Sequence, residues 1–180
     1  MSSFVELTAT STPMPAVAHA LWYVAYTLSR HEKIVQKHLN LRSVESYLPL
    51  YDKRSRWKDR TVQLQLPLFP GYVFVRMLLA ERVRILEVPG VVRLVGFSSH
   101  PAALPQGEIE ALQRTLALRK AEPYPYLAAG RRVRITSGPL EGIKGVILRR
   151  RNQVRIIVSV VSIQRSIAVE VDAADLLPLS

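Results

Sequence analysis

The sequence predicts an α+β protein made of two small domains, a mixed first domain and an all-β second domain. In the first 120 residues, strand-like and helix-like segments are intermixed without a regular βαβ alternation, which favours a mainly antiparallel sheet flanked by helices. Beyond residue 130, short strand-like segments separated by Gly, Asn or Ser predict a small five-stranded barrel, which leaves no open sheet edge. A chain of 180 residues has room for two such domains.

The elements of the first domain, residues 21–120, follow from hydrophobic periodicity and from breaker residues. Residues 1–20 carry one acidic and no basic side chain, which predicts a loose polar tail rather than a secretion signal. Residues 52–60, DKRSRWKDR, are interpreted as a charged loop or hairpin tip. The remaining segments are predicted as strands at 22–27, 44–50, 61–66, 67–75 and 91–97, and as helices at 30–42, 81–88 and 108–120.

The strand-like stretch PLFPGYVFV, residues 67–75, is apolar on both faces. Alternation sends Val73 and Val75 to one face of the sheet, and Tyr72 and Phe74 to the other. Because a strand in a small antiparallel domain commonly has one wet face, the second face needs a cover. The cover is either provided by helices and loops of the same chain or by a partner's helix or ridge, and composition alone does not decide between the two.

The character of the sequence changes at AEPYPYLAAG, where two prolines stand among small and aromatic residues. This composition predicts a linker over residues 121–129. The second domain, residues 130–180, includes the strand-like segments RRVRITS, GVILRRR, VRIIVSVV and IAVEV. The glycines of GPLEGIKG, residues 138–145, indicate a tight turn rather than a phosphate-binding loop, because no Lys-Ser/Thr pair follows the second glycine.

The chain is strongly basic, with 25 Lys and Arg against 14 Asp and Glu and a net charge of +11. Both parts contribute, with +7 over residues 1–120 and +4 over residues 121–180. A polyanionic partner is therefore expected, with nucleic acid ahead of an anionic membrane. The sequence has no cysteine, which fits a reducing cytoplasm, and no apolar run approaches the roughly 18 residues of a membrane span.

Catalytic chemistry is not indicated by any motif. The histidines, His19, His31, His38 and His100, occupy no metal-ligand pattern, and the acidic residues are scattered along the chain. No nucleophile elbow, Walker loop or dinucleotide fingerprint occurs in the sequence. We therefore expect neither an enzyme nor a metal or cofactor site.

Three basic clusters are candidate nucleic-acid contacts, although each is also compatible with a solvated surface. The first lies along one face of the first predicted helix and comprises Arg30, Lys33 and Lys37. The second lies at the hairpin tip, where a tryptophan among cations suits base stacking with phosphate contacts, and comprises Arg54, Arg56, Trp57 and Lys58. The third lies on a hairpin of the second domain and comprises Arg149, Arg150, Arg151 and Arg155.

Three segments together resemble the bacterial NusG family. Trp22-Tyr23 opens a strand, FPGYVFV follows a basic hairpin, and VRITSGPLEGIKGVI comes after the linker. The first part is similar to the NusG N-terminal domain and the second to the KOW motif, so the resemblance implies an SH3-like barrel for residues 130–180. PLFPGYVFV preceded by RSRWKDR, and QRSIAVEVD near the end, are similar to the UpxY type. UpxY-type and RfaH-type proteins are specialised antiterminators of this family, which act on particular long operons.

The resemblance implies a monomeric transcription elongation factor without catalytic residues. In that family an apolar patch on the N-terminal domain binds the clamp helices of RNA polymerase, and a basic face beside the patch contacts the single-stranded non-template DNA. By position, the polymerase patch comprises Tyr26, Phe69, Pro70, Tyr72 and Phe74. The DNA-contacting residues are expected to be Lys33, Lys37 and His38, with Arg82 and Arg84 as further candidates.

The second domain departs from housekeeping NusG, which presents an aromatic residue to Rho and to a ribosomal protein. The corresponding hairpin here has Ile163, Gln164 and Arg165 as candidate partner-binding residues. The departure favours antitermination over Rho recruitment and leaves ribosome coupling open. The β-branched residues between 154 and 171 favour strands over an RfaH-like helical refolding. The rival hypotheses are a ribosome-associated RNA-binding KOW protein and a housekeeping factor coupled to termination.

Overall fold

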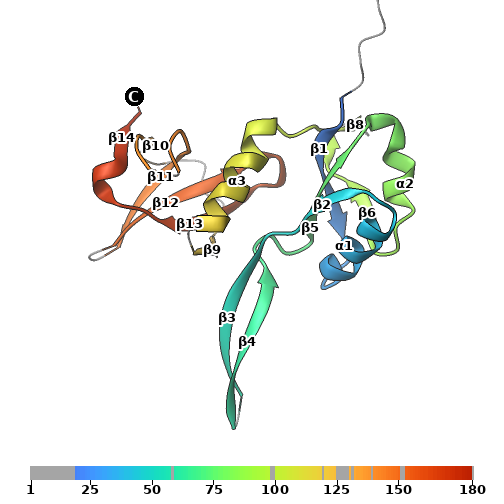
Figure 1. The fold of residues 1–180 in the computed structure, drawn as a ribbon, viewed down its shortest axis with the longest axis horizontal. Helices are drawn as coiled ribbons and strands as arrows, with labels where there is room; N and C mark the ends of the chain where they lie inside the picture. Colours follow the sequence, from blue (N-terminus) through green and yellow to red (C-terminus); the bar gives the residue numbers. More distant parts are fainter. Residues whose placement is uncertain are drawn as a thin grey trace, which may run out of the picture.

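The computed structural model describes residues 19–57, 59–97, 100–118, 120–124, 130, 132–138, 140–150 and 153–179. Residues 1–18 of the predicted tail lie outside this range. Figure 1 shows an N-terminal sheet with helices, a C-terminal sheet, the helix α3 between the two, and a two-stranded arm that projects from the body.

The chain order of the elements is close to the order predicted from periodicity. The strands are β1 (Leu21–Thr27), β2 (Glu45–Tyr47), β3 (Leu50–Trp57), β4 (Arg60–Pro67), β5 (Tyr72–Met77), β6 (Val91–Leu94), β7 (Gly96–Phe97), β8 (His100–Pro101), β9 (Ala121–Tyr124), β10 (Arg132–Ile135), β11 (Lys144–Arg150), β12 (Gln153–Val160), β13 (Arg165–Glu170) and β14 (Leu176–Pro178). The helices are α1 (Glu32–Leu41), α2 (Arg82–Leu86) and α3 (Gln106–Leu118), with short 3-10 turns η1 (Leu79–Glu81), η2 (Val161–Ile163) and η3 (Ala173–Asp175).

The N-terminal sheet is antiparallel, with the strand order β2-β5-β1-β6. Its central pair runs from Leu21 opposite Met77 to Tyr26 opposite Tyr72. The strand predicted over residues 67–75 begins later in the structure than the sequence indicates. Pro67 ends β4, residues 68–71 form a turn, and β5 begins only at Tyr72. The predicted α+β class with a mainly antiparallel sheet is confirmed.

The two faces of β5 are covered by different parts of the chain. Val73 and Val75 pack in one cluster with Val35, Leu39 and Ile85, so α1 and α2 cover that face. Phe74 packs on the other face, in a cluster that includes residues of α3 and continues into the C-terminal sheet. The alternation predicted for this strand is confirmed, and the cover of the second face is the chain itself.

The C-terminal sheet is antiparallel and has the strand order β14-β10-β11-β12-β13-β9. Five of its six strands follow residue 130, and this β-rich region fits the predicted KOW-like domain. The sixth strand, β9, is formed by residues 121–124, which the composition predicted as linker. It pairs with β13, where Pro123 is opposite Ile167. A proline is compatible with this position because β9 is an edge strand. The predicted linker residues 125–129 lie outside the described part of the chain.

The arm is a β-hairpin of β3 and β4, with eight residues in each strand. The structure extends the strands almost to the tip, whereas the sequence analysis interpreted residues 52–60 as a loop or hairpin tip. Trp57 still pairs with Arg60 at the outer end of the ladder. Figure 1 shows that the outer part of the arm extends away from both sheets.

Candidate functional site

The predicted polymerase patch is built around residues 69–72, which we call the aromatic turn. The N–H of Tyr72 donates to the carbonyl of Phe69 over 3.1 Å, and Gly71 has φ of +85°. This backbone conformation favours glycine. Tyr26 on β1 is paired with Tyr72, and the centroids of their rings are 5.5 Å apart. The β1–β5 pairing therefore brings Tyr26, Tyr72 and Phe74 to one end of the sheet, and the adjoining turn carries Phe69 and the exposed Pro70.

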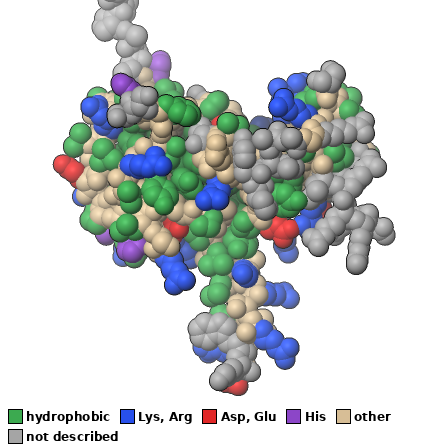
Figure 2. All heavy atoms as spheres, turned by 180° about the vertical axis from the view of Figure 1, so that it is seen from behind, with side chains coloured by type: hydrophobic (Ala, Val, Ile, Leu, Met, Phe, Trp, Pro, Cys, Tyr) green, Lys and Arg blue, Asp and Glu red, His purple; other side chains and the backbone are tan. Residues whose placement is uncertain are grey.

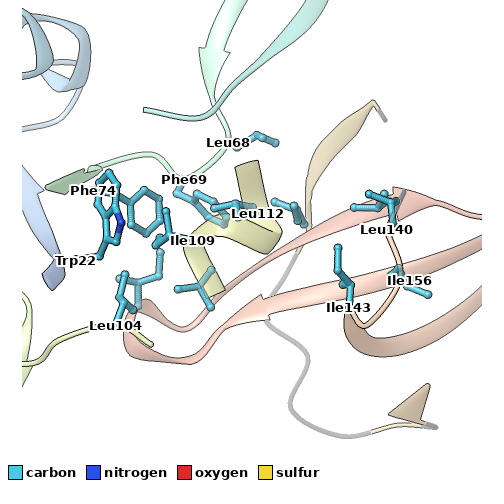
Figure 3. Packing of buried hydrophobic residues seen from close by; sticks show 14 of the residues in the cluster. Trp22, Leu68, Phe69, Phe74, Leu104, Ile109, Leu112, Leu140, Ile143 and Ile156 are labelled. Atoms are coloured by element: carbon cyan, nitrogen blue, oxygen red, sulfur yellow. The ribbon is translucent and has the colours of Figure 1, made fainter. Parts of the chain in front are cut away.

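Two of the predicted patch residues are not available for a partner in this structure. Phe69 is 1% exposed and Phe74 is 0% exposed, and their rings meet edge to face with 5.8 Å between centroids. Figure 3 shows the two rings close to Trp22, Leu104 and Ile109. The expectation that Phe69 and Phe74 form an accessible patch is therefore wrong for this structure. Large apolar rings are most stable when they leave water, and α3 supplies the apolar surface that removes them from it.

The accessible part of the patch is smaller and more polar than predicted. Tyr26 is 36% exposed, Tyr72 is half-buried and Pro70 is exposed. The guanidinium of Arg93 on β6 lies 5.4 Å from the centroid of the Tyr26 ring. This cation–π arrangement was not expected from the sequence, because only the pairing of β6 with β1 brings Arg93 next to Tyr26.

The C-terminal sheet lies against the aromatic turn. The guanidinium of Arg165 is 5.9 Å from the centroid of the Tyr72 ring. A cavity of about 310 Å³ separates the two parts and is lined by Leu68, Pro70, Pro123, Tyr124, Arg165 and Ser166. Ile163 is buried in the large cluster that also contains Phe74, and Gln164 is exposed in a left-handed conformation. The predicted polymerase patch and the predicted partner-binding residues of the second domain therefore contact each other within one molecule.

Glu32 is a functional candidate that the sequence analysis missed. It is the first residue of α1 and is 5% exposed, and its Oε1 accepts a hydrogen bond of 2.7 Å from the N–H of Gly71. The carbonyl of Gly71 in turn accepts from the N–H of Thr27. An acidic residue in the first turn of a helix is ordinarily read as favourable for the helix dipole. Here the carboxylate also holds the aromatic turn against α1 and β1.

The basic residues in and next to α1 and α2 differ in how accessible they are. Lys33, Lys37, Arg30 and Arg82 are exposed and are free to contact a polyanion. His38 is only partly exposed, and among the described residues its buried Nδ1 has no hydrogen-bond partner.

Arg84 is already used inside the molecule. Its guanidinium lies 3.7 Å from the Glu81 carboxylate and donates to the carbonyl of Arg42, while Arg42 donates to the carbonyl of Arg84 over 3.1 Å. These bonds join α2 to the end of α1, so Arg84 is less suited to nucleic acid than Arg82.

The basic residues of the arm, Arg54 and Arg56, are exposed on β3. Trp57 belongs to β3 by its backbone, and Lys58 lies outside the described residues. In the third cluster, Arg155 is paired with Glu122 of β9. The predicted clusters therefore lie on separate parts of the molecule and do not converge on one point.

The electrostatics of the described residues show no catalytic arrangement. Burial raises the pKa of Tyr47 to about 12, so its phenol stays protonated at neutral pH. The centroids of the Tyr47 and Phe74 rings are 6.3 Å apart. Burial also raises the pKa of Glu108 on α3. In the part of the chain that the structure describes, no group of three or more His, Asp or Glu side chains could hold a metal ion. No described helix is long and apolar enough to cross a bilayer.

The antiparallel N-terminal sheet with its helices and the β-rich C-terminal part together define a protein of the α+β class. The family model described as "Transcription termination factor nusG" matches residues 20–113, which is more than half of the chain. This chain therefore belongs to the NusG family, as the motif resemblance predicted. Members of this family are transcription factors, so the expectation that the protein is not an enzyme is confirmed by its family.

Several individual relatives agree with this assignment. The transcription termination/antitermination protein NusG of Rickettsia bellii is 22% identical over 137 residues, which cover 70% of this chain and 72% of the relative. The NusG protein of Helicobacter pylori is 28% identical over 144 residues, 70% of this chain and 79% of the relative. A structure describing domain interaction in Thermotoga maritima NusG has the same fold, with a TM-score of 0.57, 23% identity and coverage of 89% and 98% of the two chains.

Proposed function

We propose that this protein is a transcription elongation factor that binds the clamp helices of RNA polymerase and suppresses pausing or termination on selected operons in the bacterial cytoplasm. Membership of the NusG family supports transcription as the process, and the names of the relatives support an effect on termination or antitermination. The observation that carries the proposal is the accessible group of Tyr26, Pro70 and Tyr72 at one end of the sheet.

The geometry of this group suits docking on an apolar helix pair. Aromatic anchors in a protein interface often contribute about 2 kcal/mol each. The bond from Gly71 to the buried Glu32 carboxylate fixes the turn before the partner arrives, which reduces the ordering that binding requires. Phe69 and Phe74 are core residues that pack beneath the accessible side chains and stabilise the turn. The protein then needs only a higher affinity for the pause-resistant state of polymerase than for the paused state.

Docking in this proposal includes a movement of the C-terminal sheet. Arg165 covers the ring of Tyr72, and Pro123 and Tyr124 lie across the cavity from Pro70. A partner helix that contacts Tyr72 and Pro70 competes with these residues for the same surface. The apparent affinity for polymerase is consequently lowered by the fraction of molecules in which the sheet remains in place.

Contacts to the non-template strand are assigned to Lys33 and Lys37 on α1, with Arg30 just before α1 and Arg82 at the start of α2 as further candidates. All four are exposed, which supports the assignment. Binding of single-stranded DNA by such cations weakens with salt, with log K falling by about 0.7 per log unit of salt for each phosphate neutralised. Substitution of both lysines is expected to reduce that slope.

The test is single-round transcription by purified core polymerase through a pause site and an intrinsic terminator. We expect the protein to shorten pauses and to increase read-through, because docking disfavours the paused state. Addition of Rho separates the housekeeping alternative, in which the protein would raise Rho-dependent termination. Unchanged pausing and read-through at saturating protein would contradict the proposal, and stable comigration with ribosomal subunits in a lysate without polymerase would favour the ribosomal rival.

A further inference from the structure

The cavity between the aromatic turn and the C-terminal sheet has the composition of a small-molecule site. Its volume of about 310 Å³ lies at the lower end of the range of about 300–1,000 Å³ that is usual for ligand pockets. Its lining combines the apolar side chains of Leu68, Pro70, Pro123 and Tyr124 with the charged Arg165. Apolar walls with a small number of polar groups are the pattern by which proteins bind and orient small molecules.

Both walls of this cavity are held by backbone hydrogen bonds. On the first wall, the N–H of Leu68 donates to the carbonyl of Pro49 over 2.9 Å, and the aromatic turn follows directly. On the second wall, the pairing of β9 with β13 places Tyr124 opposite Ser166. A ligand therefore binds without first ordering these segments, which lowers the cost of binding.

The guanidinium of Arg165 has no anionic partner within the part of the chain that the structure describes. It lies 5.9 Å from the centroid of the Tyr72 ring, which orients it. The ion pairs among the described residues join other arginines, Arg76, Arg84 and Arg155, to glutamates. A guanidinium presents several N–H donors in one plane, and a carboxylate accepts two of them side by side. Arg165 is therefore suited to an anionic group of a ligand.

We propose that this cavity binds a small carboxylic acid that carries one ring. The carboxylate accepts hydrogen bonds from Arg165, and the ring packs between the apolar walls, where Pro70, Pro123 and Tyr124 offer flat surfaces. Such a molecule contacts residues of the turn and of the C-terminal sheet at the same time. It therefore stabilises the arrangement in which the two parts lie against each other.

The larger hollows of the described surface suit such a ligand less well. Two of them, of about 710 and 600 Å³, border the base of the arm, and both include Asp52, Arg54 and Lys120 in their walls. Figure 2 shows Lys and Arg side chains along the arm where it extends beyond the body. Charged walls are costly to remove from water, so an apolar ring is favoured in the cavity beside Arg165.

Binding of the acid gives the proposed function a means of regulation, and this step rests on that function. In the proposed function, polymerase docking requires the C-terminal sheet to leave Tyr72 and Pro70. A ligand that binds only while the sheet is in place shifts the population away from the docking-competent state. At a ligand concentration of ten times its Kd, mass action should weaken the apparent affinity for polymerase about tenfold.

The first experiment titrates the full-length, ¹⁵N-labelled chain with 3-phenylpropionate and follows the amide signals by NMR. We expect saturable shifts at Leu68, Tyr124 and Arg165, with a Kd in the millimolar range that is usual for a ligand of so few atoms. The alcohol 3-phenylpropanol keeps the ring without the charge, and propionate keeps the charge without the ring. Each should bind at least about fivefold more weakly, because each loses one of the two contacts.

The variant Arg165→Gln removes the positive charge but keeps a polar side chain, and it should weaken binding of 3-phenylpropionate at least about fivefold. Arg134→Gln is the matched control, because Arg134 is an exposed arginine of the same sheet, on β10, and does not line the cavity. Its effect should stay below about twofold. Equal losses for the two variants, equal binding of the acid and the alcohol, or shifts without saturation would overturn the proposal.

The second experiment measures the affinity of the chain for core polymerase in the presence of 3-phenylpropionate at ten times its Kd. Propionate at the same concentration is the ionic control. Polymerase binding should be about tenfold weaker with 3-phenylpropionate and unchanged with propionate. Unchanged affinity with an occupied cavity would overturn the regulation. A chain that does not bind polymerase even without ligand would instead contradict the proposed function, and the NMR titration, which contains no polymerase, still decides on the ligand site.

Discussion

Replacement of Phe74 by alanine is expected to lower the free energy of unfolding by about 3–5 kcal/mol, the range observed when a buried aromatic ring is deleted. Phe74 is 0% exposed and meets Phe69 edge to face, so its removal leaves a cavity between β5 and α3. Urea denaturation followed by circular dichroism measures the change. The loss should be seen as a lower midpoint with an unchanged slope, since the surface exposed on unfolding stays similar.

Phe97→Ala is the matched control for this substitution, because it deletes the same side chain from a site where it is 78% exposed. Its effect should stay within about 0.5 kcal/mol. If Phe74→Ala lowered the free energy of unfolding as little as Phe97→Ala, Phe74 would not be a core residue. Phe74 would then again be a candidate for the accessible patch. The comparison also shows that loss of polymerase binding by a Phe74 variant must be interpreted together with its stability.

A covalent link between the aromatic turn and the C-terminal sheet is expected to reduce polymerase affinity at least hundredfold. The chain has no cysteine, so Pro70→Cys combined with Arg165→Cys introduces the only thiols. Both positions line the same cavity of about 310 Å³, which suits a short bifunctional thiol reagent with a reducible bridge. The linked protein keeps the sheet over Tyr72, and the docking-competent state is no longer populated.

Each linked sample serves as its own control, because a reductant cleaves the bridge without changing the sequence. Affinity for core polymerase should return after reduction, and the single Arg165→Cys variant treated with the same reagent should show no change of comparable size. If the linked and the reduced protein bound polymerase within about threefold of each other, the C-terminal sheet would not control access to the aromatic turn.

Local signals in the sequence were sufficient for most of the fold. The alternation at residues 72–75 predicted the two faces of β5, and breaker residues separated the helices from the strands. The alternation could not identify what covers Phe74, because that depends on where α3 packs, and the packing of a helix on a distant strand leaves no periodic signal. The strand β9 was missed for a related reason. Its pairing with β13 is a long-range choice that overrides the linker-like composition.

The candidate site was predicted in part. Tyr26, Pro70 and Tyr72 were named from their positions in the sequence, and the structure brings them together. Glu32 and Arg93 were not named, since their roles depend on a hydrogen bond to Gly71 and on the pairing of β6 with β1.

The proposed function depends on one property, namely that Tyr26 and Tyr72 at the end of the sheet are the surface that polymerase recognises. The direct measurement is the dissociation constant for core polymerase of a Tyr26→Ala and Tyr72→Ala double variant, with Leu79→Ala and Val83→Ala as a control that removes two other exposed apolar side chains. The dissociation constant should rise at least thirtyfold for the tyrosine variant and less than about twofold for the control. A tyrosine variant that remains folded and binds polymerase as tightly as the parent would contradict it.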